Sequence, residues 1–227
     1  CRSDRELSDE AREKIALFTN VEKQSVISMP DVDSIYKIPI QLNLQKVDDL
    51  VTNKLKLTCK KPELEDWKRV TEAHVNPTNE ITIAMVGKYT DLKDAYKSLN
   101  EALVHGGIQH KLKINISYVD SEIIEPKNVG KVLQGVDAIL VPGGFGYRGI
   151  EGMITTAEFA RERKIPYLGI CLGMQVAIIE FARNVLKLSG ANSSEFDNKT
   201  SHPVIGLISE WMDSKGEIEK RDENSDL

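Results

Sequence analysis

A single cysteine flanked by glycines lies in the segment GICLGMQ, residues 169–175. A short apolar segment precedes it and a helix-like segment follows, so Cys171 is expected on a tight strand-to-helix turn. Gly169 and Gly173 leave room for this turn and for close packing of the strand on the helix. The positive end of the helix favours the thiolate, the nucleophilic form of cysteine. The pattern predicts a nucleophile, and a buried cysteine in a tight turn is the alternative.

A glycine pair, Gly143-Gly144, lies at the end of another apolar segment, residues 136–144. This segment is the predicted strand before the one that leads into the cysteine turn. A glycine backbone can approach a substrate closely, so this pair could supply an N–H to a developing oxyanion. The N–H of Leu172, next to the nucleophile, is the second candidate donor. Together with the cysteine turn, this pair predicts a nucleophile elbow with backbone donors for an oxyanion.

Strands and helices alternate around these two motifs. The hydrophobic patterns predict strands at 81–87, 112–118, 136–144, 166–170 and 203–209, and helices at 91–104, 128–133, 155–164 and 173–188. Such alternation is typical of a doubly wound, mostly parallel α/β sheet. Ligands bind such sheets outside the carboxyl ends of the strands, and both glycine motifs fall there.

The chain divides into three predicted parts. Residues 1–61 are too short for a core of their own and are expected to be the tail of a preceding domain. Residues 62–80 mix charge and proline and are expected to form a linker, with a helix near 64–72. Residues 81–227 are expected to form the α/β domain. Their polar end adds no core element, so the domain is expected to be truncated there.

Composition excludes several classes. The 227 residues carry a net charge of −5 and are 41% hydrophobic, which predicts neither a nucleic-acid surface nor a membrane span. Three widely spaced cysteines without a CxxC pair argue against zinc or a disulfide framework. A reducing, cytoplasmic location is therefore expected.

Several longer segments resemble a known family. VPGGFGYRGIEG, YLGICLGMQVAIIEFARNVL and ANSSEF resemble the class I glutamine amidotransferase domain of the CTP synthase family. CRSDRELSDEAREKIALFTNV and DVDSIYKIP resemble the end of the synthetase domain of that family, a P-loop-type α/β domain. The resemblance covers essentially the whole chain.

The resemblance implies an activity and its partners. Cys171 would attack the side-chain amide of glutamine, form a thioester and release ammonia. At the synthetase site, ATP with Mg²⁺ would phosphorylate O4 of UTP, and ammonia would displace the phosphate to give CTP. GTP would be the allosteric activator and CTP a feedback inhibitor. A homotetramer that can stack into filaments is expected, with no nucleic-acid or membrane partner.

The resemblance also implies residue roles. Glutamine contacts are expected from Gly144, Leu172, Gly173, Met174, Gln175 and Glu195. Gly143 would serve the oxyanion, Phe145 would form a pocket wall, and Arg148 would contact an anion or act as a lid in the GTP-responsive loop 146–152. Lys14 is expected near the pyrimidine nucleotide and Val32 near the ATP adenine, and no metal ligand is expected in this chain. The alternatives are a solvated carboxylate for Glu195, a core aromatic for Phe145, and solvated cations for Arg148 and Lys14.

One departure concerns the general base. The family completes its triad with a histidine and a glutamate in an H-P-E context, and none of the four histidines has that context. His202 precedes Pro203 but is expected to be structural. We therefore expect the base outside this chain, and we expect the chain alone not to turn over glutamine.

Three other readings stay open. A non-enzymatic or chaperone-like member of the superfamily would keep the cysteine but lack a glutamine pocket. The glutaminase unit of carbamoyl phosphate or GMP synthetase would not be expected to carry DVDSIYKIP. A purely structural fragment, with the N-terminal part as a dimer element, is the third.

Overall fold

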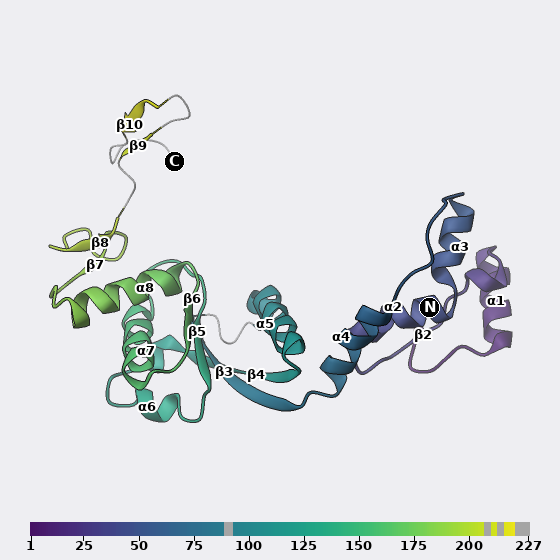
Figure 1. The fold of residues 1–227 in the computed structure, drawn as a ribbon, viewed down its shortest axis with the longest axis horizontal. Helices are drawn as coiled ribbons and strands as arrows, with labels where there is room; N and C mark the ends of the chain where they lie inside the picture. The colour runs from purple at the N-terminus through teal and green to yellow at the C-terminus, as the bar shows by residue number, and fades with distance from the viewer. Residues whose placement is uncertain (89–92, 207–209, 213–215, 221–227) are drawn as a thin grey trace. The chain divides into compact units, whose positions relative to one another are not determined.

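The computed structural model describes residues 1–88, 93–206, 210–212 and 216–220 (Figure 1). It divides into two compact units. The first combines Cys1–Glu80 with Ala102–Lys113, and the second combines Ile81–Glu101 with Ile114–Leu227.

The first unit is built from short helices. Its elements are β1 (Arg2–Ser3), α1 (Asp9–Thr19), β2 (Met29–Pro30), α2 (Ile38–Leu44), α3 (Val47–Lys54) and α4 (Glu65–Val75), with single 3-10 turns at Lys23–Ser25 and Ile35–Lys37. β1 pairs parallel with β2. The Ser8 hydroxyl accepts a hydrogen bond from the Ala11 N–H and so caps α1.

Helix α4 lies inside the segment predicted to be a linker. The predicted helix near 64–72 is present, and it extends to Val75. Trp67 Nε1 donates to the Tyr36 carbonyl at 2.7 Å, and the Thr71 hydroxyl donates to the same oxygen at 3.0 Å. These bonds tie α4 to the segment before it, because a buried carbonyl needs a donor.

The second unit contains a four-stranded sheet with the order β4-β3-β5-β6. The strands are β3 (Asn79–Gly87), β4 (Leu112–Asp120), β5 (Ala138–Val141) and β6 (Tyr167–Gly169). β5 pairs parallel with β3 through Ala84↔Ile139 and with β6 through Leu140↔Leu168. The prediction of an α/β fold with a mostly parallel sheet is confirmed.

Helices α6 (Val129–Val132), α7 (Ile150–Arg163) and α8 (Leu172–Glu180) belong to this unit. α7 and α8 pack on each other, and both contact β6. Their apolar side chains complete one core with the strands, formed by Ala84, Val86, Ile139, Val141, Met153, Ile154, Leu172, Val176 and Ile179, among others. Fully burying one such aliphatic side chain contributes roughly 1.5–3 kcal/mol, so this core holds the helices on the sheet.

Three predicted helices have different bounds. The first, predicted at 91–104, is found as a 3-10 turn at Lys93–Tyr96 followed by α5 (Lys97–Gln109), and residues 91–92 lie outside the described residues. α7 begins at Ile150 rather than at 155, because Ile150, Met153 and Ile154 are buried and extend its apolar face. The helix predicted at 173–188 is α-helical only to Glu180 and continues as a π-helical turn, Phe181–Val185.

The described part of the predicted strand 203–209 pairs outside the main sheet. β8 (Pro203–Ile205) pairs parallel with β7 (Asn192–Ser193), and residues 207–209 lie outside the described residues. β9 (Glu210–Met212) pairs antiparallel with β10 (Ile218–Lys220). Among the described residues, no helix has the length and apolar character that a membrane span requires.

Candidate functional site

Three strands of the parallel sheet end at one edge, and a candidate residue follows each of them. Lys88 follows β3, Gly143-Gly144 follow β5 after one proline, and Cys171 follows β6 after one isoleucine. Because β3, β5 and β6 are adjacent and parallel, their carboxyl ends lie together.

Cys171 is held in an unusual backbone conformation. Its φ is 52° and its ψ is −106°, a combination that L-residues rarely adopt. The Ile170 N–H donates to the Val141 carbonyl at 3.0 Å, and the Met174 and Gln175 N–H groups both donate to the Cys171 carbonyl at 3.1 Å. These bonds fix the cysteine as the N-cap of α8, with its side chain exposed. Strain held in this way at a helix start is typical of a nucleophile turn.

Both glycines of the motif are required by their surroundings. A Cβ on Gly173 would overlap the Val141 carbonyl oxygen, and a Cβ on Gly169 would overlap the Gly173 carbonyl. The Tyr167 hydroxyl donates to that same Gly173 carbonyl at 2.8 Å. Burial, with the charge of Glu180, raises the pKa of Tyr167 well above its ordinary value, so the hydroxyl keeps its proton. The close packing of β6 on α8 that the motif predicts is therefore present.

The second glycine pair lies against the cysteine turn. A Cβ on Gly143 would lie 3.5 Å from the Cys171 Cβ, and a Cβ on Gly144 would lie 3.2 Å from Leu172 Cδ2. Leu172 begins α8, so its N–H has no acceptor within the helix. The glycine pair therefore packs against the cysteine turn, close to the residues that carry the candidate oxyanion donors.

A lysine that the sequence analysis did not single out anchors the loop after Gly144. Lys88, only 5% exposed, donates through its Nζ to the Phe145 carbonyl at 2.8 Å and to the Gly146 carbonyl. Burial and the nearby Arg148 charge lower its pKa, and Glu195 and Glu122 oppose this shift. It follows a buried strand directly, but a lysine at such a position is ordinarily solvated, so the sequence carries no signal that would have identified it.

The same loop makes two further contacts, one through its own Arg148 and one with Glu195. The Arg148 guanidinium donates to the Lys88 carbonyl at 2.7 Å and to Glu122 Oε2 at 2.9 Å. The Gly146 N–H donates to Glu195 Oε1 at 3.3 Å. Glu195 follows β7. The residue before β7, Ala191, accepts a hydrogen bond at its carbonyl from Arg183 Nε at 2.6 Å, which fixes the start of this strand. The loop is thus bonded to Lys88 through Arg148 and to Glu195 through the Gly146 N–H, although these residues are far apart in the sequence.

The remaining predicted residues have different surroundings. Phe145 is 84% exposed, Met174 is exposed, and Gln175 is half-buried in the first turn of α8. In the first unit, Lys14 is exposed on α1 and Val32 is half-buried after β2. Among the described residues, no group of three or more His, Cys, Asp or Glu side chains could hold a metal ion.

Two of the four histidines, His74 and His105, have side-chain partners in the first unit. His74 Nδ1 lies 3.1 Å from the Ser34 hydroxyl, and both His74 and His105 pack edge-on against the Tyr36 ring. The His202 carbonyl accepts from the Asn192 N–H, which joins β7 to β8. Within the described part of the chain, no histidine hydrogen-bonds to the Cys171 thiol.

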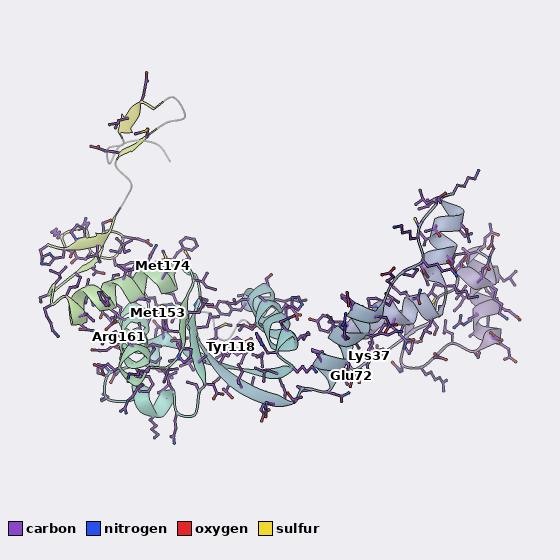
Figure 2. All side chains as sticks on the ribbon, viewed as in Figure 1. Lys37, Glu72, Tyr118, Met153, Arg161 and Met174 are labelled. Carbon is purple, nitrogen blue, oxygen red and sulfur yellow. The ribbon has the colours of Figure 1, made fainter. Side chains whose placement is uncertain are left out.

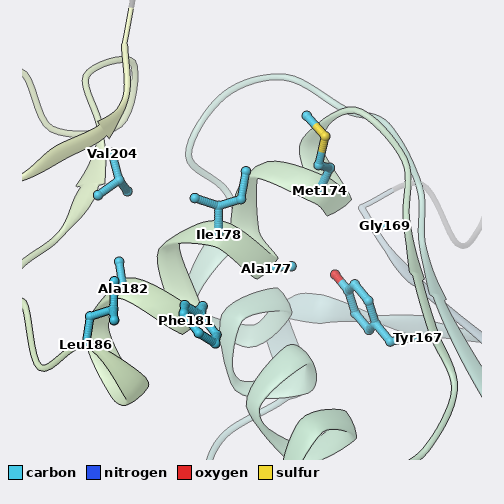
Figure 3. A pocket seen from close by; sticks show the side chains of 9 residues that line it. All are labelled: Tyr167, Gly169, Met174, Ala177, Ile178, Phe181, Ala182, Leu186 and Val204. Carbon is cyan, nitrogen blue, oxygen red and sulfur yellow. The ribbon is translucent and has the colours of Figure 1, made fainter.

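An apolar pocket of about 440 Å³ lies along α8 (Figure 3). Its lining residues are Tyr167, Gly169, Met174, Ala177, Ile178, Phe181, Ala182, Leu186 and Val204. Cys171 is not among them, and an almost wholly apolar lining does not suit an amide or an amino-acid group. The glutamine site is therefore not assigned to this pocket.

Comparison with known families agrees with this geometry. Residues 1–57 match the family described as CTP synthase N-terminus. Residues 91–219, more than half of the chain, match glutamine amidotransferase class-I. The chain belongs to the class I glutamine amidotransferases, of the CTP synthase type. The resemblance of its motifs to CTP synthase is confirmed.

A solved structure shows the same amidotransferase fold. It is the glutaminase domain of CTPS from Trypanosoma brucei with bound acivicin, which is 45% identical to this chain with a TM-score of 0.53. The match covers 56% of this chain and 50% of the Trypanosoma brucei chain. The present chain therefore spans about half the length of that structure.

Proposed function

We propose that this chain carries the glutaminase centre of a CTP synthase, with Cys171 as the nucleophile. The observation that carries the proposal is the strained, exposed Cys171 at the start of α8, with Gly143 packed close to its side chain. The family membership and the match to a glutaminase domain support it.

The proposed reaction has two stages. The Cys171 thiolate attacks the side-chain amide carbon of glutamine, and the negative charge that develops on the amide oxygen is stabilised by the N–H groups of Leu172 and Gly144. The C–N bond then breaks, the nitrogen takes a proton and leaves as ammonia, and a thioester remains. Water hydrolyses the thioester to glutamate and restores the thiol.

The amino-acid end of glutamine needs polar partners. We assign Glu195 to its ammonium group, because a carboxylate forms a charge-assisted hydrogen bond with a cation. Glu195 lies within hydrogen-bond distance of the loop that carries Gly144, which supports this assignment. Gln175, Gly173 and Met174, in the first turn of α8, are proposed as the neighbouring contacts.

The acid–base group is assigned to none of the four histidines. Two of them pack on Tyr36 in the first unit, and His202 is engaged through its backbone between β7 and β8. Proton transfer to the leaving nitrogen typically contributes 10²–10⁴-fold, so the intact protein needs such a group from elsewhere.

The synthetase half of the reaction is proposed from family membership. ATP would phosphorylate O4 of UTP, and ammonia would displace the phosphate to give CTP. Mg²⁺ would accompany the ATP, but the described residues do not fit a metal site, so no step is assigned to it here. Lys14 and Val32 are proposed near the nucleotides, and Arg148 is proposed as the residue that senses GTP.

Acivicin, which the related glutaminase domain binds, provides the test. All three cysteines are exposed, so exposure alone does not favour one of them. In the intact protein, we expect acivicin to modify Cys171 before Cys1 or Cys59, and we expect glutamine to protect it. Peptide mass spectrometry over time measures the order, with Cys59→Ser as the matched control. Equal modification of Cys59, or no protection by glutamine, would sink the proposal.

A further inference from the structure

The loop between β5 and α7, residues 143–149, has little intrinsic preference for one conformation. Four of its seven residues are glycine, at positions 143, 144, 146 and 149. Gly146 and Gly149 have φ values of 73° and 68°, which glycine adopts without strain. A loop of this kind keeps one shape only if other groups hold it.

Lys88 bonds to the middle of this loop. Its ammonium donates to the carbonyls of Phe145 and Gly146, and its Cδ would lie 3.9 Å from a Cβ on Gly144. The lysine therefore bonds to two successive residues, and the first of them directly follows Gly144, the candidate oxyanion donor. Removing it would leave two carbonyls without their donor, which costs free energy unless the loop turns them to water.

The Lys88 bonds also set the direction of the next N–H group. In a trans peptide, the carbonyl and the N–H point in opposite directions. Because the Phe145 carbonyl points to Lys88, the Gly146 N–H points away from it, and Glu195 Oε1 accepts that N–H. One peptide unit thus links Lys88 to the residue proposed to bind the glutamine ammonium.

Arg148 closes the arrangement from the other end of the loop. It donates to the carbonyl of Lys88 itself, while Glu122 holds its guanidinium in place. Lys88, at the end of β3, bonds to the loop through its side chain, and Arg148 of the loop bonds back to the Lys88 carbonyl. This reciprocal pair of contacts resists rotation better than either bond alone.

We infer that Lys88 is a positioning residue of the glutaminase centre, which keeps Gly144 in place next to Leu172 at the cysteine turn and is held by Arg148. This role rests on the proposed function, because it concerns the same reaction. In this proposed role, Lys88 contacts neither the Cys171 thiol nor the glutamine substrate. It acts through the loop, so its loss should lower the rate of the chemical step more than it weakens glutamine binding.

The test compares two reagents on the intact protein without nucleotides. The rate of modification by acivicin depends on the organised glutamine site, whereas the rate with iodoacetamide depends only on the reactivity and accessibility of the Cys171 thiol. We expect Lys88→Met to slow modification of Cys171 by acivicin about 10²-fold, the scale of a misplaced catalytic group, and to leave the iodoacetamide rate within about twofold. Glutamine turnover should show the same loss in kcat with a KM within about threefold.

The matched control is Lys127→Met, because Lys127 forms an exposed ion pair with Glu125 on the surface of the same unit. It should keep every rate of the unchanged protein. Arg148→Met is the second variant, exposed and therefore safer for folding, and should lower the acivicin rate about tenfold.

The outcomes separate the two proposals. An unchanged protein that neither reacts with acivicin nor hydrolyses glutamine overturns the proposed function, and with it the role of Lys88. A reactive unchanged protein with equally reactive Lys88→Met and Arg148→Met overturns the role of Lys88 alone. Equal losses with acivicin and iodoacetamide also overturn it, because they would show damage to the turn at Cys171 rather than a displaced loop.

Discussion

At the scale of single residues, conformation distinguishes Cys171 from the other two cysteines. All three are exposed, but Cys171 alone among them has a positive φ and starts a helix. Such a backbone costs on the order of 1–3 kcal/mol and persists because the packing of Gly169 and Gly173 determines it. Glu195 is a different case, because its single loop contact does not by itself distinguish a binding group from a solvated carboxylate.

Replacing Glu195 tests its assignment. Glu195→Gln keeps an acceptor for the Gly146 N–H but removes the charge that would meet the glutamine ammonium. A hydrogen bond to a charged group contributes about 1.5–3 kcal/mol, so KM for glutamine should rise roughly 10- to 100-fold while kcat stays within about threefold. Steady-state glutaminase kinetics measure this, and an unchanged KM would return Glu195 to a solvated surface role.

At the scale of elements, an ion pair between a partly exposed arginine and a buried glutamate joins helices α7 and α8. Arg161 on α7, labelled in Figure 2, donates through Nε to both oxygens of Glu180 on α8, at 3.0 and 3.1 Å. A second nitrogen of its guanidinium donates to Glu180 at 2.8 Å. Glu180 is 3% exposed, so its charge depends on this partner and on Asn184 at 3.2 Å. The same pair holds the axis of α8, on which the direction of the Leu172 N–H depends.

Breaking this pair should loosen α8. Arg161→Met leaves Glu180 buried without its cation, and we expect the local free energy of opening of α7 and α8 to fall by about 3 kcal/mol, the low end for buried pairs because Arg161 is partly exposed. Amide hydrogen exchange of the intact protein measures it. The double variant Arg161→Met/Glu180→Leu should recover most of the protection. A single variant no worse than the double one would show that the pair contributes nothing.

At the scale of the whole molecule, the proposed function divides the chemistry between two sites. The matches to two families in one chain, residues 1–57 and residues 91–219, are the reason to expect both. Ammonia would be made beside Cys171 and consumed where UTP is activated. The second site needs ammonia but not the thiol.

The coupling can be tested with one substitution. In the intact protein, Cys171→Ala should abolish glutamine-dependent formation of CTP and leave ammonia-dependent formation within about threefold, because the synthetase step needs no nucleophilic cysteine. CTP formation from UTP and ATP with Mg²⁺ is followed with either nitrogen source, and Cys59→Ala should keep both activities. Loss of both activities in a folded Cys171→Ala protein would contradict the two-site arrangement.

The sequence alone determined the α/β class, the cysteine turn and the family. These depend on local patterns: apolar periodicity marks β3 and β5, and only glycine fits at positions 169 and 173 beside the turn. The helix bounds were less predictable, because packing of Ile150 and Met153 in the core extends α7 toward its start.

Only the tertiary structure decided which residues surround Cys171. The parallel order β3-β5-β6 brings Lys88, Gly144 and Cys171 to one edge, although they are far apart in the chain. No local pattern marks Lys88, since a lysine after a strand is ordinarily solvated. Its burial beneath the loop and its bonds to two carbonyls arise from contacts across more than fifty residues, which strand pairing creates and periodicity does not record.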